Sequence, residues 1–305
     1  MTILPVNFIP QCYAITCTNQ SNPSPSYCPS ELIHTSNTSS EKRMNLGLEG
    51  KTALVSASTA GIGLAIATQL LEDGARVIIN GRSEAGVLQR VSELNNRFGE
   101  GRALPLVADV SQAGGESVAA AAYPHIDILI NNMGTYALSD FFSTSDEDWQ
   151  RMFETNVWSG VRLARIYMKG MLERGHGRVI FISSEVALTP MAAMAHYSAS
   201  KATQLSVSRS LAELTKGTSV TVNAVLPGPT ETESLKSFIE SVNPGLPYAE
   251  AEKKFMAENR PSSLIYRLAK PAEVANVVAF LSSERAAAIN GAAIRAEGGT
   301  VQTIA

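Results

Sequence analysis

The stretch Thr52-Ala-Leu-Val-Ser-Ala-Ser-Thr-Ala-Gly-Ile-Gly63 decides how this chain folds. Its first residues include a short apolar run, Ala53–Val55, of the kind found in buried strands. A turn with two glycines follows, and then a helical stretch over residues 62–73 that stops at Gly74. Glycines between a strand and a helix let the backbone approach a phosphate, which binds the free amides of the helix start. A tight turn that needs glycine for its shape alone is the structural alternative.

Short apolar runs and helical stretches alternate from residue 51 onward. This alternation predicts one α/β domain, a doubly wound parallel sheet of about seven strands with helices on both faces. Ligands of such sheets bind beyond the carboxyl ends of the strands, so we expect the functional residues there. One helical stretch, Asn156–Arg174, carries an apolar stripe of Val157, Val161, Ala164, Met168 and Met171. The expected strands are Thr52–Ser56, Val77–Asn80, Ala103–Val107, Ile126–Asn131, Arg178–Ser183, Val220–Val225 and Ala292–Ala296.

Composition argues against several kinds of partner. The chain has 305 residues, 45% of them hydrophobic, which is enough for a large core. Its net charge of -3 and the lack of a basic block argue against nucleic acid, and no apolar run approaches the ~18 residues of a membrane span. The three cysteines precede the alternating region and the four histidines are scattered, so we predict no bound metal.

Residues 1–43 differ in composition from the rest of the chain. They are rich in Ser, Thr, Asn and Pro, and they contain no Lys or Arg before Lys42. Pro5 and Asn7 interrupt the apolar residues, which is not the pattern of a secretory signal. We predict a disordered extension over 1–43, a catalytic domain over 44–305 with Met44 as the functional start, and a cytoplasmic location. A short regulatory or targeting extension is the alternative.

Ser184, Tyr197 and Lys201 stand in a fixed register after the fifth expected strand. Tyr197 and Lys201 are four residues apart, so on a helix they share one face. An ammonium held near a phenol favours the phenolate and lowers the tyrosine pKa from ~10. A serine hydroxyl at a strand end could hydrogen-bond a carbonyl beside that phenol. Together the three predict proton transfer to or from a carbonyl or alcohol oxygen.

A second Tyr-x-x-x-Lys pattern, Tyr266 to Lys270, lacks this context. Lys270 precedes Pro271, which disfavours a helical lysine and breaks the shared face. We therefore expect Tyr266 to be a surface or packing residue. We expect the same of His196, because neighbouring helical residues point to different faces.

The order of these motifs resembles the short-chain dehydrogenase/reductase family, and within it the 3-oxoacyl-acyl-carrier-protein reductases. The resemblance covers residues ~45–305 and implies a Rossmann-type sheet that binds a dinucleotide. The matching motifs are Ser56-x-x-x-x-Gly61-Ile-Gly63, Asp109-Val110, Asn131-Asn-Met-Gly134, Asn156, Ser184, Tyr197-x-x-x-Lys201 and Pro227-Gly228.

The resemblance also implies a role for each matching residue. Tyr197 is the expected acid/base and Ser184 positions the substrate oxygen. Lys201 lowers the tyrosine pKa and contacts the nicotinamide ribose, and Asn156 holds a water of a proton relay. Pro227-Gly228 is either part of the nicotinamide site or a rigid turn. The expected cofactor-binding residues are Thr59, Gly61, Ile62, Gly63, Arg82, Asp109, Val110, Asn132, Gly134, Tyr197, Lys201, Pro227, Gly228, Thr230 and Thr232.

Two positions depart from the family pattern. Ala57 stands where the family usually has glycine, which adds a methyl where the backbone passes the adenosine. Met133 stands where the family usually has alanine, and we expect its bulk near the adenosine half of the cofactor.

Charge at the end of the second expected strand favours NADP over NAD. Gly81 occupies the place where NAD-specific members carry an acidic residue for the ribose diol. Arg82 follows, and a guanidinium suits a 2′-phosphate. Ala60 fills the slot of a second basic residue found in many NADP-using relatives, which argues the other way.

The predicted function is NADP(H)-dependent hydride transfer between the nicotinamide and a small-molecule carbonyl or secondary alcohol. A catalytically silent dinucleotide-binding protein, or an isomerase or lyase that uses the cofactor transiently, are the alternatives. Residues 233–262 either fold over an apolar substrate or pack as ordinary helices. The resemblance further implies a homo-oligomer, a tetramer or a dimer.

Overall fold

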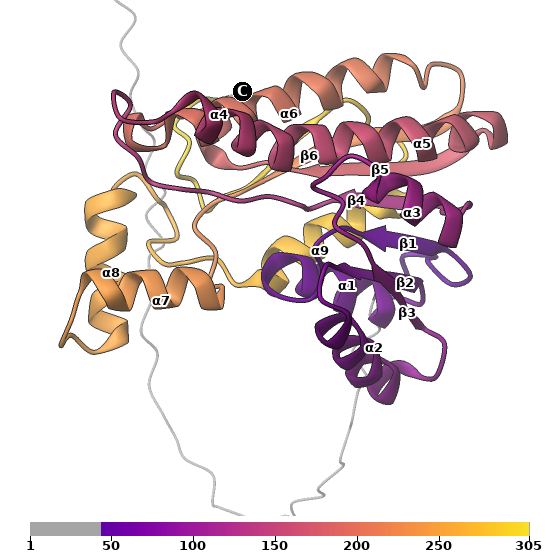
Figure 1. Cartoon of the computed structure of the whole chain (residues 1–305), viewed down its shortest axis with the longest axis horizontal. Helices are drawn as coiled ribbons and strands as arrows, with labels where there is room; N and C mark the ends of the chain where they lie inside the picture. The colour runs from indigo at the N-terminus through magenta and orange to yellow at the C-terminus, as the bar shows by residue number, and fades with distance from the viewer. Residues whose placement is uncertain (1–43, 305) are drawn as a thin grey trace, which may run out of the picture. The chain divides into compact units, whose positions relative to one another are not determined.

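The computed structural model describes residues 44–304, and the predicted extension over 1–43 lies outside them. In that part of the chain, seven strands form one sheet in the order β3-β2-β1-β4-β5-β6-β7. Every neighbouring pair is parallel, so the predicted doubly wound sheet is confirmed (Figure 1). The strands are β1 (Thr52–Val55), β2 (Arg76–Gly81), β3 (Ala103–Val107), β4 (Ile128–Asn131), β5 (His176–Ile182), β6 (Ser219–Pro227) and β7 (Ala293–Ala296).

Each face of the sheet has its own apolar core, because successive strand residues point to opposite sides. Val55 and Ile66 belong to the cluster that joins the sheet to α1, α2 and α9. Leu54 and Leu163 belong to the cluster that joins it to α3, α5 and α6, and Figure 1 shows the two helix layers on either side. The helices that cover the sheet are α1 (Gly61–Glu72), α2 (Glu84–Phe98), α3 (Gly115–Ala122), α4 (Asp146–Phe153), α5 (Ser159–Arg174), α6 (Ala195–Glu213) and α9 (Pro271–Ser282).

One helix differs from the prediction at a position that bears on function. α4 runs without a break into a π-helical turn over Glu154–Trp158, and α5 continues from that turn. The π-turn carries Asn156, whose side chain is fully buried. Turns of this kind are uncommon inside helices and often lie at functional sites. Of the predicted apolar stripe only Val161 is partly exposed, and the other four residues are buried.

Two further helices, α7 (Glu233–Val242) and α8 (Tyr248–Asn259), follow the carboxyl end of β6 and form what we call the α7–α8 lobe (Figure 1). The lobe has a small apolar core of its own, made of Ile239, Ala251, Met256 and Leu268. No helix among residues 44–304 is both long and apolar enough to span a bilayer.

Candidate active site

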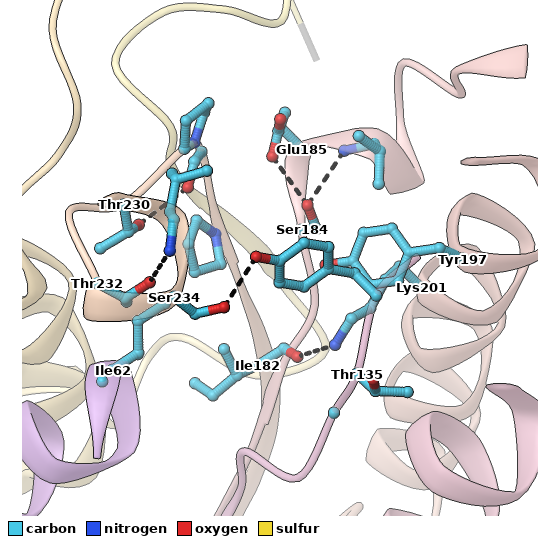
Figure 2. Close-up of a pocket in the computed structure, with 18 of the residues that line it drawn as sticks. Ile62, Thr135, Ile182, Ser184, Glu185, Tyr197, Lys201, Thr230, Thr232 and Ser234 are labelled. Carbon is cyan, nitrogen blue, oxygen red and sulfur yellow. Dashed lines mark hydrogen bonds between the residues drawn. The ribbon is translucent and has the colours of Figure 1, made fainter. Parts of the chain in front are cut away.

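A cavity of about 590 Å³ opens at the carboxyl ends of the strands, which is a size typical of small-molecule sites. Ser184, Tyr197 and Lys201 all lie on its wall (Figure 2). The glycine turn at the start of α1 forms another part of the wall, and Phe238 and Phe255 of the α7–α8 lobe line it as well. One cavity therefore joins the predicted reaction centre to the predicted nucleotide turn.

Ser184 lies two residues beyond the end of β5 and caps the short 3₁₀ helix that follows. Its hydroxyl donates to Glu185 Oε2 at 2.8 Å and accepts from the Val186 N–H at 3.4 Å. The neighbouring Ser183 is used differently, because its hydroxyl donates to the main-chain oxygen of Lys201 at 2.9 Å. The structure thus brings Ser184 to the reaction centre and gives Ser183 a hydrogen bond that joins β5 to α6.

Tyr197 and Lys201 project from the first turns of α6, as their spacing predicted. The Lys201 ammonium lies 5.7 Å from the centroid of the Tyr197 ring. It donates to Ile182 O at 2.9 Å and to Gln204 Oε1 at 3.2 Å. Lys201 is only 4% exposed, and burial lowers its pKa to about 7. The lysine is therefore poised between its charged and neutral forms near neutral pH.

The pKa of Tyr197 is raised above 10, which contradicts the expectation of a more acidic phenol. Burial is the main cause, the Glu185 carboxylate and Tyr136 add to it, and the Ser184 hydrogen bond and Arg260 act in the opposite direction. The Lys201 ammonium donates to Ile182 O, and its own lowered pKa weakens it as a cation. The raised pKa of Tyr197 favours the neutral phenol in this site.

Asn156 lies behind the cavity wall and connects three elements. Its Oδ1 accepts from Thr135 N at 2.8 Å, and its Nδ2 donates to Thr135 O at 3.0 Å and to Ser200 Oγ at 2.9 Å. Its main-chain oxygen accepts from Gln204 Nε2 at 2.6 Å, and the other end of that amide contacts the Lys201 ammonium. The amide of Gln204 thus bridges Lys201 and the Asn156 carbonyl.

The glycine turn suits a phosphate group. α1 begins at Gly61, which has a φ of +57°, and no side chain caps the first turn. A Cβ added at Gly63 would lie 2.5 Å from Ala57 O, so only glycine lets the helix start this close to the turn. Asn80 secures the turn from β2, since its Oδ1 accepts from Ala57 N at 3.0 Å. The uncapped amides on the cavity wall are the donors that a dinucleotide phosphate would bind.

Twelve of the sequence-predicted residues border this cavity, and five do not. Asn156 supports the wall from behind, and Arg82 is exposed at the end of β2. Thr59 lies against Gly81, and its carbonyl accepts from Arg90 Nε at 3.2 Å. Asp109 accepts from Ser111, and the Val110 side chain is buried in the core. The residues on the wall are Gly61, Ile62, Gly63, Asn132, Gly134, Ser184, Tyr197, Lys201, Pro227, Gly228, Thr230 and Thr232.

Both departures from the family pattern have structural consequences. Ala57 adopts a φ of +51°, a left-handed conformation that favours glycine. Met133 packs against the core cluster that contains Leu54, and it does not line the cavity. The expectation that Met133 adds bulk near the adenosine stays a prediction, because Arg82 and Asp109, the residues expected near that half of the cofactor, do not line this cavity either.

The structure also shows where Tyr266, His196 and residues 233–262 lie. Tyr266 is 52% exposed with a φ of +50°, and Lys270 belongs to the N-cap of α9, so the second pattern is not a helical pair. His196 is buried with its ring 6.0 Å from that of Trp149, which is a packing role. In the α7–α8 lobe, Phe238 lines the cavity while Ile239 lies in the core of the lobe, so part of residues 233–262 packs as ordinary helix. That the segment folds over an apolar substrate stays a prediction.

Two charged residues of the site were missed by the sequence analysis. Glu185 is 3% exposed and forms an ion pair with Arg260, whose Nη2 lies 2.8 Å from Glu185 Oε1. Arg260 lies 75 residues further along the chain, at the end of α8. The signal for Glu185 was a lone acidic residue between Ser184 and the apolar Val186-Ala-Leu188, a place where a buried charge needs a partner.

A parallel sheet whose strand ends form one cavity with a glycine turn and with Ser184, Tyr197 and Lys201 is an arrangement typical of oxidoreductases that use a nicotinamide cofactor. The family model described as short chain dehydrogenase matches residues 51–243, and the chain belongs to that family.

Relatives agree with this assignment. The chain is 52% identical over 263 residues to the uncharacterized oxidoreductase YvaG of Bacillus subtilis (strain 168), covering 86% of this chain and 100% of YvaG. It is 34% identical over 254 residues to the 3-oxoacyl-[acyl-carrier-protein] reductase FabG of Escherichia coli (strain K12), covering 83% of this chain and 98% of FabG. The predicted similarity to that reductase is confirmed.

Two solved structures share the fold, and one contains NADPH while the other contains NAD. L-sorbose reductase from Gluconobacter frateurii, complexed with NADPH and L-sorbose, is 31% identical with a TM-score of 0.80, covering 86% of this chain and all of that one. A 3-oxoacyl-[acyl-carrier protein] reductase from Brucella melitensis with bound NAD is 26% identical with a TM-score of 0.73, covering 84% of this chain and 92% of that one. The chain is therefore a dehydrogenase/reductase enzyme.

Proposed function

We propose that this enzyme is an NADP(H)-dependent oxidoreductase that interconverts a small-molecule carbonyl and a secondary alcohol, with Tyr197 as the acid/base. The observation that carries the proposal is the meeting of Ser184, Tyr197 and Lys201 on the wall of the cavity that contains the α1 glycine turn. When bound, NADPH supplies the hydride that reduces the carbonyl carbon.

The residues of the chain account for the proton in this proposal. The neutral Tyr197 hydroxyl donates its proton to the carbonyl oxygen, and the phenolate left behind is reprotonated from solvent. Ser184 lies beside the same oxygen and positions it. Lys201 is held by Ile182 O and Gln204 close to Tyr197, where it can contact the ribose, and Asn156 fixes the segment that contains Thr135. In the reverse direction Tyr197 first loses its proton to solvent, and the phenolate oxygen then takes the proton of the alcohol.

NADP is the proposed cofactor because Arg82 is exposed where β2 ends and the neighbouring Gly81 carries no acid. The NADPH complex of L-sorbose reductase supports this choice, and the NAD complex of the Brucella protein keeps NAD as the alternative. The apolar wall that includes Phe238 and Phe255 favours an uncharged carbonyl compound. We also propose that the enzyme is cytoplasmic and forms a homo-oligomer. Trp158, the residue before α5, is 46% exposed, and an exposed aromatic side chain at this place supports contact between subunits.

The test measures NADPH and NADH oxidation with a panel of carbonyl compounds that includes acetophenone, ethyl acetoacetate and L-sorbose. Tyr197→Phe should abolish turnover, while NADPH binding measured by fluorescence persists. The matched control is Tyr266→Phe, which alters the other Tyr-x-x-x-Lys pattern on the surface and should keep full activity. Turnover near that of the unmodified enzyme in Tyr197→Phe would remove Tyr197 from the mechanism. A higher kcat/KM with NADH would overturn the assignment to Arg82.

A further inference from the structure

An acidic side chain is buried next to the serine of the reaction centre. Glu185 Oε2 accepts the Ser184 hydroxyl at 2.8 Å, and Glu185 Oε1 accepts from both Nε and Nη2 of Arg260 at 2.9 Å and 2.8 Å. Both side chains border the cavity, yet Glu185 is 3% and Arg260 12% exposed. A buried carboxylate needs such a partner, because an unpaired charge is costly to remove from water.

This contact fixes the hydrogen-bonding direction of Ser184. A serine hydroxyl has a single proton, and here that proton is directed at a carboxylate, which makes a strong, charge-assisted hydrogen bond. The Val186 N–H occupies one lone pair of the same oxygen. The second lone pair faces the cavity, and the hydroxyl donates to Tyr197 or to a substrate oxygen only when its proton turns away from Glu185.

The partner of Glu185 comes from a different part of the fold. Arg260 is the residue at which α8 ends, and its Nη1 also donates to Asn259 O at 2.7 Å. The guanidinium thus connects the α7–α8 lobe directly to the carboxylate that holds Ser184 (Figure 2 shows the contact between Ser184 and Glu185). The position of the lobe and the orientation of the serine are joined through one side chain.

We propose that Glu185 and Arg260 are positioning residues of this enzyme: Glu185 sets the direction of the Ser184 hydroxyl, and Arg260 neutralises Glu185 when α8 is seated on the cavity. The proposal rests on the proposed function, since it assigns the pair to the proton transfer of Tyr197. Neither residue touches the reacting atoms in this role. They act through Ser184 and through the charge that Tyr197 experiences.

The charge balance around Tyr197 makes the proposal testable. The ionisable groups that face Tyr197 are Glu185 after β5, Arg260 at the end of α8, Tyr136 after β4, and Lys201 on its own helix. Glu185 opposes ionisation of Tyr197, whereas Arg260 favours it. With the pair intact, Arg260 offsets part of the larger effect of Glu185 on the pKa of Tyr197. Removing one member leaves the other uncompensated, and the sign of the effect on Tyr197 depends on which member is removed.

The experiment titrates Tyr197 in the NADP⁺ complex by the ultraviolet absorbance of its phenolate. The signal of Tyr197 is isolated as the difference between each protein and the same protein carrying Tyr197→Phe. Arg260→Met should move the titration to higher pH by about one unit, because a lone carboxylate remains nearby. Glu185→Gln should move it to lower pH by about one unit, because the amide still accepts from Ser184 while the Arg260 charge is unmatched. The double variant should return close to the parent.

The matched control is Arg267→Met. Arg267 and Glu273 also form a two-pronged pair, with Nη2 to Oε1 at 2.8 Å, but both are 45% exposed and neither borders the cavity. That variant should leave the Tyr197 titration unchanged. Shifts of Arg260→Met and Glu185→Gln in the same direction, or no shift in either, would overturn the proposal, since a purely structural pair gives no opposite signs.

Two features keep the outcome decisive. If Arg260→Met does not fold, Glu185→Gln must still move the titration to lower pH and the double variant must return it toward the parent, and failure of either result would overturn the proposal. Neither of these variants leaves a buried carboxylate alone. Arg260→Lys, which keeps the charge but not the two-pronged contact, should recover most of the parent titration. The phenolate fraction at a single alkaline pH reports the same shift when the full curve is out of reach. The titration of Tyr197 needs no turnover. Absence of activity would therefore refute the proposed function, while the titration would still decide whether Glu185 and Arg260 are positioning residues.

Discussion

Replacing Asn156 with alanine should both destabilise the enzyme and slow it. The Asn156 side chain is fully buried in the π-helical turn and makes three hydrogen bonds to Thr135 and Ser200. Thr135 belongs to the cavity wall, and Ser200 lies one residue before Lys201. Asn156→Ala removes these three bonds and a weaker one from Asn156 Nδ2 to Met152 Sδ at 3.1 Å, and it substitutes no residue that borders the cavity.

The size of the effect follows from these contacts. At about 1 kcal/mol for each hydrogen bond, the unfolding free energy should fall by about 3 kcal/mol. Thr135 is exposed and can bind water instead, so no further penalty is added for it. In a protein of this size the loss corresponds to a decrease in Tm of roughly 6–12 °C. The segment that includes Gly134 also loses its anchor. This segment lies close to the reaction centre, since a Cβ built at Gly134 would lie 3.3 Å from the Lys201 ammonium. Because a displaced segment would disturb the geometry around Lys201, kcat should fall roughly tenfold or more.

Urea unfolding and steady-state kinetics of NADPH oxidation, run well below the Tm, measure the two effects. Asn95→Ala is the matched control, because Asn95 makes two hydrogen bonds to the backbone of Ala103, at 2.8 Å and 3.1 Å, far along the sheet from the cavity. That variant should lose about 2 kcal/mol and keep its kcat. A loss below about 1 kcal/mol in Asn156→Ala, or an unchanged kcat, would refute the anchoring role.

Two further variants test local features of the site. Ala57→Gly should raise the unfolding free energy by about 0.5 kcal/mol, because the left-handed strain of alanine at a φ of +51° outweighs the extra freedom of glycine in the unfolded chain. Calorimetry measures the gain, and a decrease would contradict the strain argument. In the cofactor-free protein the pKa of Lys201 is about 7 in the folded state and 10.5 in the unfolded state. Between these pH values the unfolded chain binds more protons than the folded one, so the unfolding free energy rises with pH. Lys201→Met should abolish this rise. From about pH 7.5 to about pH 9 the rise attributable to Lys201 is up to about 2 kcal/mol, and parallel curves for parent and variant would show that Lys201 is charged in the fold.

Local sequence was sufficient for the sheet and for the first contacts of the site. The expected strand over Ala103–Val107 matches β3, an edge strand that pairs with β2 alone, because a short apolar run between polar residues is a local strand signal. β6 extends two residues further at its carboxyl end than expected, since Leu226 and Pro227 still pair with β7. Ser184, Tyr197 and Lys201 line the same cavity, as their spacing predicted, because a strand end and one helix turn are rigid units.

Features that depend on distant residues were not predictable in the same way. The partner of Glu185 is Arg260, and no local pattern relates positions so far apart. The π-helical turn at Asn156 departs from the 3.6-residue period that the helix prediction assumed. The bridge made by Gln204 could have been suspected, because it lies three residues after Lys201 on the same helix. The raised pKa of Tyr197 follows from burial, which the spacing of two residues does not reveal.

The burial that overturned this expectation has a consequence for the direction of proton transfer. Tyr197 lies between a lysine directed at Ile182 O, with a pKa of about 7, and a carboxylate paired with Arg260, so neither neighbour stabilises a phenolate strongly. Among the described residues that face Tyr197, Arg260 is opposed by Glu185 and Lys201 is only partly charged near neutral pH, so ionisation of Tyr197 gains little from them. On the proposed function, the oxidised nicotinamide carries a positive charge that favours the phenolate. The proton then stays on Tyr197 while the reduced cofactor is bound, when the carbonyl oxygen requires a donor. It leaves more readily once the cofactor is oxidised, when an alcohol requires a base.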